Sequence, residues 1–266
     1  MRKTLGSASE IITSLTSKSS NATLLDYPTG AYTGMRTFDK IGIMDFTGHA
    51  ARLATSLQQI VFPGTTDSSA HEIKEEDVAA TVGLAALRDT DTMKKEATDL
   101  VRAGLKFYYK QLKEGLKNGE LAAAVTAVGE TKEPTLIAHF EPLRAPKSSR
   151  CKVQVHGSPR HLATAKDSQW VRDRKALEDA LDKDSNEALL VDNETQDVYE
   201  GLSSNFFAFD RKRQTLLTAP MGSVLQGTIQ KVVMNICKAE NISVAYEFPN
   251  LKNIDDWEGA FISSKS

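Results

Sequence analysis

The sequence predicts a mixed α/β (α+β) protein built from two domains. Three observations support this prediction. Up to about residue 118 the chain contains segments with apolar residues at helical spacing. From residue 121 on, segments appear that alternate apolar and polar residues with the period of a strand. A stretch rich in Pro, Lys and Ser at about 142–150 lies between the halves and marks a linker. The length of 266 residues suits two smaller domains, and we expect them at 1–145 and 146–266.

In the first half, two segments have the clear period of an amphipathic helix. They are residues 47–62, which include Arg52, and residues 94–118. An acidic start predicts a further helix at 74–87. Segments of period two then predict strands at 121–130 and 135–143 and, just beyond the linker, at 151–157.

In the second half, helices and strands are expected to alternate. Residues 167–183 predict one helix and residues 228–240 predict another. The inward residues of this second helix are expected to be Ile229, Val232, Val233 and Ile236. Strands are expected at 187–192, 205–210, 215–219 and 242–248, the middle two forming a hairpin.

The composition argues against several classes of function. A formal net charge of -2, with acids and bases mixed along the chain, offers no basic surface for nucleic acid or an anionic membrane. No apolar run is long enough to span a membrane. The two cysteines and five histidines show neither a disulfide framework nor metal-ligand spacing, so no metal is expected. The cytoplasm is the expected location, with an organelle reached by a Ser/Thr-rich transit peptide as the alternative.

Three segments carry candidate binding chemistry. Gly227 and Thr228 precede a helix, so Thr228 is expected to cap it and to offer either a phosphate site or an ordinary capped start. Lys166 lies at a strand-to-helix junction, where it is either solvated or the amine of a Schiff base. Arg36 and Arg52 lie in mostly apolar surroundings, where each forms either a structural ion pair or a clamp on a phosphate or carboxylate.

Together these features require a ligand with a carbonyl, a phosphate and a group that attracts a carboxylate. Pyridoxal 5′-phosphate has all three, because its aldehyde pairs with a lysine, its phosphate with an arginine and a helix N-terminus, and its ring nitrogen with an acid. Glu200, at the mouth of the apolar strand in VYEGLSSNFFAFD, is the candidate acid. It is expected to keep the ring nitrogen protonated, so that the cofactor draws electrons from a substrate carbanion.

The motifs and their order resemble the class IV pyridoxal-phosphate enzymes, which are branched-chain aminotransferases, D-amino acid aminotransferases and aminodeoxychorismate lyases. The matching pieces are GAYTGMRTFD, HAARLATSL, AKDSQWVRDR, EALLVD with VYEGLSSNFFAFD, LLTAP with VLQGTIQKVV, and DDWEGAFISS. They cover most of the chain, and EGLSSNFF followed by LLTAP and VLQGT is the specific part of this signature. The chain is most similar to branched-chain aminotransferase-like proteins.

The resemblance implies roles for the matching residues. Lys166 corresponds to the Schiff-base lysine that also moves the substrate's α-proton, Glu200 to the partner of the ring nitrogen, and Arg52 to the phosphate-binding arginine. The other cofactor-binding residues are Ser203, Ser204, Asn205, Gly227, Thr228 and Ser264. The substrate-binding residues are Tyr32, Arg36, Trp170 and Ser263.

The resemblance also implies the fold and the reaction. The fold is type IV of the pyridoxal-phosphate enzymes, with a smaller N-terminal α/β domain and a larger C-terminal domain of mixed sheet, in a homodimer. The expected reaction transfers the amino group of an amino acid, of branched-chain type, to a 2-oxo acid through the lysine Schiff base. The partners are therefore these small molecules.

Two departures from the family pattern leave alternatives open. Gln169 and Trp170 follow the lysine, where the family has Asn with Tyr or Leu, so a hydroxyl beside the cofactor is lost and the substrate class is open. Lys265 stands where threonine is common, and the family continues with a further strand and helix, so a shortened C-terminus is expected. The alternatives are an aminodeoxychorismate lyase-type enzyme and a catalytically inactive relative.

Overall fold

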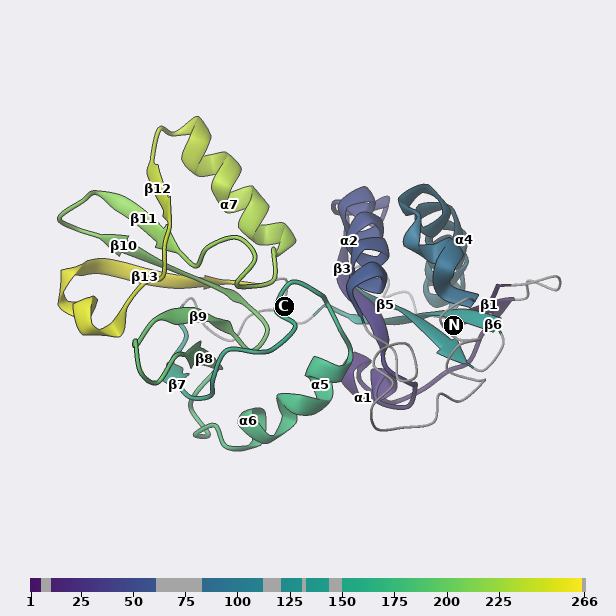
Figure 1. Cartoon of the computed structure of the whole chain (residues 1–266). Coiled ribbons are helices and arrows are strands. Elements are labelled where there is room, and N and C mark those ends of the chain that lie inside the picture. Colours follow the sequence, from purple (N-terminus) through teal and green to yellow (C-terminus); the bar gives the residue numbers. More distant parts are fainter. Residues whose placement is uncertain (6–10, 61–82, 112–120, 131–132, 144–149, 265–266) are drawn as a thin grey trace. The chain divides into compact units, whose positions relative to one another are not determined.

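The structure, a computed structural model, describes residues 1–5, 11–60, 83–111, 121–130, 133–143 and 150–264. Its internal contacts divide the chain into two units, most of whose helices and strands are labelled in Figure 1. Unit 1 comprises Met1–Arg144 with Ala165–Arg172, and unit 2 comprises Ala145–Thr164 with Asp173–Ser266. Unit 1 spans more residues than unit 2, whereas the resemblance implied a smaller N-terminal domain. The division into domains 1–145 and 146–266 stays a prediction, because the contacts assign Ala165–Arg172 to unit 1 although this segment follows residue 146.

Unit 1 is built on a six-stranded antiparallel sheet with strand order β2-β1-β6-β5-β3-β4. Its strands are β1 (Arg2–Thr4), β2 (Ile11–Ile12), β3 (Gly30–Phe38), β4 (Gly42–Ile43), β5 (Leu121–Glu130) and β6 (Glu133–Pro142). The strands predicted at 121–130 and 135–143 are therefore confirmed, as β5 and β6. Alternation along β3 turns Tyr32 and Arg36 to one face of the sheet and Thr33 to the other.

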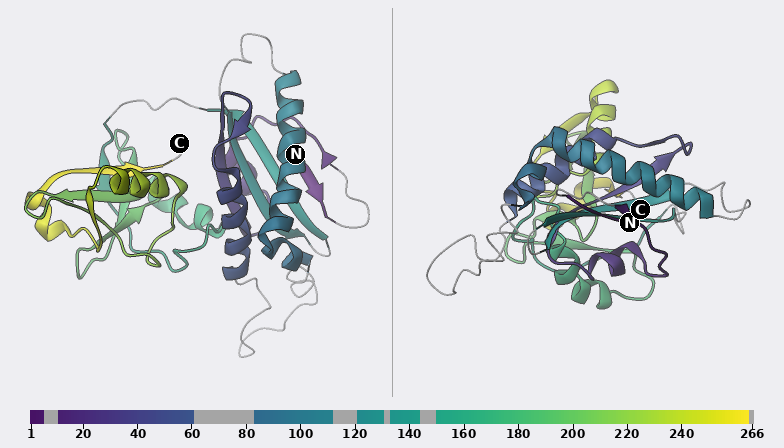
Figure 2. Two further views of the ribbon diagram at one scale, coloured as in Figure 1. Left: turned by 90° about the horizontal axis from the view of Figure 1, so that it is seen from above. Right: turned by 90° about the vertical axis from the view of Figure 1, so that its right-hand side faces the viewer.

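Helices cover both faces of this sheet. They are α1 (Ser20–Leu24), α2 (Phe46–Gln59), η1 (Ala85–Arg88) and α4 (Thr90–Gln111). Helices α2 and α4 lie side by side on one face and α1 lies on the other (Figure 2). The predicted helices at 47–62 and 94–118 correspond to α2 and α4, although residues 61–62 and 112–118 lie outside the described residues. Most of the helix predicted at 74–87 also lies outside them.

Helix α2 begins at a tightly packed cap. Asp45 is the N-cap residue, with a φ of 49°, and its side chain accepts the N–H of Gly48 at 3.3 Å. A Cβ at Gly48 would lie 2.3 Å from a carboxylate oxygen of Asp45, so a larger residue here would displace the capping side chain. The cap sets the start of the helix that carries Arg52.

Unit 2 is built on a seven-stranded mixed sheet of order β12-β11-β10-β9-β8-β7, with β13 paired to β10. Its strands are β7 (Val153–Val155), β8 (Glu187–Val191), β9 (Val198–Gly201), β10 (Asn205–Asp210), β11 (Thr215–Thr218), β12 (Ser243–Tyr246) and β13 (Trp257–Ser263). The pairs β7–β8 and β11–β12 are parallel, and the others are antiparallel. The predicted hairpin is confirmed as β10–β11, whereas β13 was not predicted.

The helices of the second half differ from the prediction in two respects. They are α5 (Gln169–Asp173), α6 (Lys175–Asp179), α7 (Thr228–Ala239) and the short η3 (Leu251–Asp256). The single helix predicted at 167–183 is wrong, because the chain forms α5 and α6 with a break at Arg174. The inward face predicted for α7 is also wrong in part, because Val232 and Ile236 are 47% and 53% exposed. Instead, Cys237 is buried against Phe207 and Leu216.

Among the described residues, no helix is both long and apolar enough to cross a membrane. No group of histidine, cysteine and acidic side chains in these ranges gathers as a metal site. Cys151 is exposed, Cys237 is buried, and both are free thiols.

We expect Phe207 to be the residue on which the stability of unit 2 depends most. Its side chain is fully buried and stacks on Phe261, with 4.7 Å between ring centroids. Phe207→Ala should lower the free energy of unfolding by about 3–5 kcal/mol, because it leaves a large cavity. Phe261 is 43% exposed, so Phe261→Ala, the matched control, should cost roughly 1 kcal/mol.

Guanidinium unfolding followed by tryptophan fluorescence measures this difference. In a Trp170→Phe background the remaining Trp257, which packs against Phe206 in unit 2, reports on that unit. Equal costs for the two phenylalanine variants would contradict the packing described above.

Candidate functional site

The predicted site residues are divided between the two units. Unit 1 contains Tyr32, Arg36, Arg52, Lys166 and Trp170. Unit 2 contains Glu200, Ser203, Ser204, Asn205, Gly227, Thr228, Ser263 and Ser264. The first group is arranged around β3 and the second around the start of β10.

Lys166 lies beside the start of β3, and its backbone is held on both sides. Its carbonyl accepts the N–H of Tyr32 at 3.0 Å, and its own N–H donates to Oγ of Ser56 on α2 at 3.0 Å. Ala31 and Asp167 form an antiparallel bridge next to these bonds. The side chain is half-buried, and its Nζ lies 4.6 Å from the centroid of the Tyr32 ring, within the range of a cation–π contact. The amine is thus held against an aromatic face.

Arg52 belongs to a polar cluster between α2 and β3. Its Nη2 donates to Oγ1 of Thr33 and lies 3.2 Å from Nδ1 of His49. A guanidinium only donates, so Nδ1 of His49 is the acceptor, and the Thr33 hydroxyl donates to it at 2.7 Å. The Nε atom of Arg52 is buried and has no hydrogen-bond partner in the described part of the chain.

The electrostatic state of Arg52 points to an anion. Within the described ranges no carboxylate lies within ion-pair distance of its guanidinium, and Asp45 acts on it only from farther away. Burial lowers the pKa of the Arg52 side chain from its usual range to about 10, because the charged form has lost water. A cation in this state gains most from an external anion.

Tyr32 and Arg36 lie on the face of β3 opposite to Thr33 and the polar cluster. Tyr32 is buried with Leu24 and Val171. Arg36 is half-buried, and its Nε has no hydrogen-bond partner among the described residues. Arg52 therefore approaches β3 from one side, and the two residues predicted to bind substrate point to the other.

In unit 2, three predicted residues form one row across three strands. Asn205 is paired with Glu200 of β9 and with Ser263 of β13. Residues that are directly paired on neighbouring strands project to the same face. Glu200 accepts the N–H of Leu225 through Oε2 at 3.2 Å, and Asn205 donates through Nδ2 to the Leu225 carbonyl at 2.7 Å. The segment that leads into α7 is therefore bonded to this row.

Within the described residues, the start of α7 has polar groups without hydrogen-bond partners. Gly227 is the N-cap residue and Thr228 the first helical residue, so the prediction that Thr228 caps the helix is wrong. No side chain caps this end, and the Thr228 hydroxyl is buried without a hydrogen-bond partner among the described residues. The same holds for the hydroxyl of Ser263. A Cβ at Gly227 would lie 2.2 Å from Oδ1 of Asn205, so glycine alone allows this close approach.

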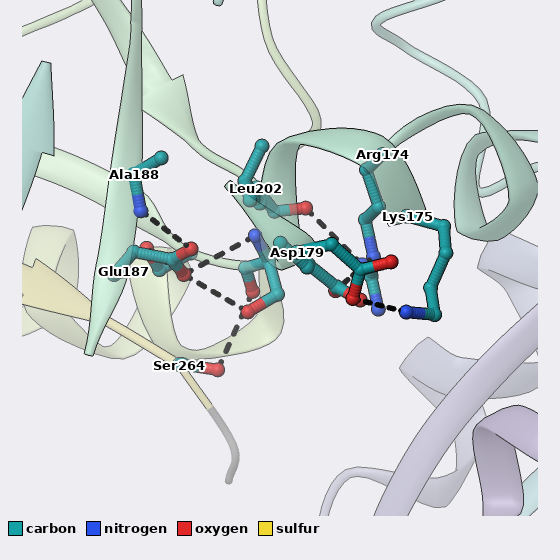
Figure 3. Close-up of polar contacts among 10 residues, drawn as sticks. Arg174, Lys175, Asp179, Glu187, Ala188, Leu202 and Ser264 are labelled. Carbon is teal, nitrogen blue, oxygen red and sulfur yellow. Dashed lines mark hydrogen bonds and ion pairs between the residues drawn. The ribbon is translucent and has the colours of Figure 1, made fainter. Parts of the chain in front are cut away.

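The loop between β9 and β10 is held by a residue that the sequence analysis missed, Glu187 at the start of β8. Its buried Oε2 accepts the backbone N–H of Ser203 at 3.3 Å, the Ser203 hydroxyl at 2.9 Å and the Ser204 hydroxyl at 3.1 Å. Figure 3 shows Glu187 at the centre of these bonds, together with the N–H of Ala188. Both serine hydroxyls thus face Glu187 and act as anchors of the loop.

Two further bonds hold the same loop from other elements (Figure 3). Ser264, just after β13, donates to the Ser203 carbonyl at 3.3 Å. Arg174, at the break between α5 and α6, donates to the Leu202 carbonyl at 3.1 Å. The break in the predicted helix therefore places a buried arginine against the loop.

Arg160 is the second residue that the sequence analysis missed. Its Nε donates to Oε1 of Glu200 at 2.7 Å, and each of the two side chains is only 7% exposed. Arg160 lies in a segment without helical or strand periodicity, so its sequence position alone does not reveal this partner.

The fold is of the mixed α/β class, as predicted, and it contains two sheets. A family model, Amino-transferase class IV, matches residues 30–266, which include every site residue named above. The chain therefore belongs to the class IV aminotransferases, enzymes that depend on pyridoxal 5′-phosphate, and the resemblance seen in its motifs is confirmed.

Solved structures share this fold at low identity. The branched-chain aminotransferase of Thermoproteus uzoniensis has a TM-score of 0.65 and 18% identity, covering 90% of this chain and 75% of its own. An aminotransferase from Brucella abortus bound to pyridoxal phosphate has a TM-score of 0.62 and 15% identity, covering 99% and 87%. A protein from Legionella pneumophila assigned to the 4-amino-4-deoxychorismate lyases has a TM-score of 0.61 and 14% identity. The match covers 94% of this chain and 84% of the Legionella protein. No curated protein matches the chain.

We expect inorganic phosphate to stabilise the protein through Arg52. The pKa of this group falls to about 10 on folding, so the cost of burying its charge is fully present at neutral pH and is relieved only as the pH rises through about 10. Saturating phosphate at pH 7 should offset that cost and raise Tm by about 2–6 °C. Thermal unfolding of the wild type and of Arg52→Met measures this shift. Arg102→Met, which removes an exposed arginine, is the control, and a full shift in Arg52→Met would refute the assignment.

We also expect Glu187→Gln to loosen the loop. The amide has one acceptor oxygen and brings an NH2 group toward hydroxyl and N–H donors, so unfolding should become easier by about 2 kcal/mol. Chemical denaturation measures this loss. Glu194→Gln, on an exposed turn of the same unit, should change stability by less than about 0.5 kcal/mol. Combining Glu187→Gln with Ser204→Ala should cost less than the sum of the two, and strict additivity would argue against the network.

Proposed function

We propose that this chain is a pyridoxal-phosphate-dependent aminotransferase that moves the amino group of an amino acid, of branched-chain type, to a 2-oxo acid. Family membership supports the general chemistry. The observation that carries the proposal is the buried hydroxyl of Thr228 at the start of α7, which has neither a partner nor a side-chain cap among the described residues. It lies in the same unit as the buried carboxylate of Glu200. A phosphate and a protonated ring nitrogen require these two kinds of group.

The residues present suit this cofactor. In unit 2, Gly227 and Thr228 at the start of α7 would hold the phosphate, and Glu200 would hold the ring nitrogen. In unit 1, Arg52 would supply a cation to the phosphate, and Lys166 would supply the amine that bonds to the aldehyde carbon. The bound cofactor supplies an electron sink for the carbanion that forms at the substrate's α-carbon.

Lys166 has two tasks in the proposed reaction. Its amine would bond to the cofactor in the resting enzyme, and its Nζ, once free, would take up the α-proton of the substrate and hold it for return. The bonds that fix its backbone to Tyr32 and Ser56 limit how far Nζ moves between these tasks. A second amino acceptor, such as 2-oxoglutarate, would complete the cycle.

The remaining predicted residues would shape the pocket. Tyr32, Arg36, Trp170 and Ser263 are proposed to contact the substrate. Ser203, Ser204, Asn205 and Ser264 are proposed to act mainly through the position of the loop, since their side chains bond to other parts of unit 2. A homodimer, implied by the resemblance, is part of this proposal.

A lyase with the same cofactor is the second candidate, and the fold shared with the Legionella protein favours it. It would use Lys166 and Glu200 in the same way. The two reactions differ in their requirement for a second substrate, because a transaminase stops after one turnover without a 2-oxo acid, whereas a lyase continues. Product analysis with and without 2-oxoglutarate separates them.

We expect purified protein with added pyridoxal phosphate to show a visible absorption band that Lys166→Ala lacks. Borohydride reduction followed by peptide mass analysis should place the cofactor on Lys166. Lys183→Ala, which removes an exposed lysine, should keep the band. Amino acids that bleach the band identify the substrate class. A band of wild-type strength in Lys166→Ala would refute the role of this lysine.

A further inference from the structure

We propose that Arg160 is a positioning residue that keeps Glu200 ionised and oriented toward the ring nitrogen of the cofactor. The inference deepens the proposed function and rests on it. Arg160 is absent from the motifs that identify the family resemblance, and it acts here through Glu200 rather than on the cofactor itself.

The geometry fixes the Glu200 carboxylate from two sides. Arg160 Nε donates to Oε1 at 2.7 Å, and the N–H of Leu225 donates to Oε2 at 3.2 Å. The guanidinium is in turn tied to its own loop, because Nη2 donates to the carbonyl of Ala163. Two donors on two different oxygens restrict rotation of the carboxylate, so its orientation does not depend on a ligand.

Burial makes this ion pair an electrostatic requirement. Each of the two side chains is 7% exposed. A carboxylate buried to this extent without a cation tends to take up a proton, whereas an arginine beside it stays charged and favours the ionised form. A protonated Glu200 would offer a donor where a protonated ring nitrogen needs an acceptor. Protonation of the ring nitrogen would therefore depend on Arg160, which acts through the Glu200 carboxylate.

A surface pair in the same unit provides the contrast. Arg213 and Glu247 also form an ion pair, but their side chains are 48% and 46% exposed. Water screens such a pair, so the loss of Arg213 leaves a carboxylate that is still in contact with water. Arg213→Gln is therefore the matched control for Arg160→Gln.

The test measures binding rather than turnover. Apoprotein is titrated with pyridoxal 5′-phosphate and with its 1-deaza analogue, in which a C–H group replaces the ring nitrogen, and the ratio of the two dissociation constants is compared between variants. Wild type and Arg213→Gln should bind pyridoxal phosphate roughly 10–100-fold more tightly than the analogue, the range expected for a charge-assisted hydrogen bond. Arg160→Gln should bring the ratio close to one. Arg160→Lys, which keeps the charge, should retain most of the discrimination.

The outcomes separate this inference from the proposed function. If the wild type binds the cofactor and the 1-deaza analogue with equal dissociation constants, Glu200 does not bond the ring nitrogen, and the proposed function loses that residue. A wild-type ratio in Arg160→Gln, or an equal loss in the Gln and Lys variants, would overturn the role of the Arg160 charge. Unchanged affinity for the analogue shows that a variant is folded at the site. Should Arg160→Gln not fold, Arg160→Lys decides alone, since a ratio near that of the wild type supports the inference and a ratio near one overturns it.

Discussion

A buried carboxylate needs either a cation or a set of hydrogen-bond donors, and unit 2 is organised around two carboxylates that meet this need in different ways. Glu200 has the guanidinium of Arg160 and the backbone N–H of Leu225. Glu187 has no cation within ion-pair distance among the described residues and collects the donors of Ser203 and Ser204 instead. Leaving either acid without partners would cost several kcal/mol. The loop between β9 and β10, and the segment before α7, follow the paths that bring these donors to the two acids.

Unit 1 contains a buried cation, Arg52, that has no carboxylate within ion-pair distance among the described residues. Helix α2 carries His49, Arg52 and Ser56 at intervals of three and four residues, so all three lie on one face of the helix. This polar face holds the backbone of Lys166 through Ser56 and presents a guanidinium that has lost water. In unit 2, the Thr228 hydroxyl has no hydrogen-bond partner and no side chain caps the start of α7, within the part of the chain that the structure describes. Each unit by itself therefore has groups that a phosphate would satisfy, which is the strongest physical support for a phosphorylated cofactor.

Prediction from the sequence succeeded where structure depends on local periodicity and failed where packing overrides it. The period of two in residues 121–130 and the apolar run in 205–210 led directly to β5 and β10. The helix predicted at 167–183 is divided at Arg174, whose side chain bonds the Leu202 carbonyl of a distant loop, a contact that local periodicity does not reveal. The buried face predicted for α7 was wrong in part, because Val232 and Ile236 are exposed. An amphipathic pattern in a short helix does not determine which of its apolar residues pack against the sheet. The N-cap of α7 is Gly227 and not the predicted Thr228. At Gly227 a Cβ would lie 2.2 Å from Oδ1 of Asn205.

The sequence by itself determined the secondary structure of most strands, the family and the identity of the candidate lysine, acid and arginine, because periodicity and short motifs are local properties. Only the tertiary structure decided which groups support them. Arg160 and Glu200 are 40 residues apart, and Glu187 and Ser203 are 16 apart, so no local pattern connects them. Their pairing follows from how the strands of one sheet are ordered and which side chains are buried between them. Burial turns an ordinary arginine or glutamate into a group that requires a partner, and burial is a property of the folded chain.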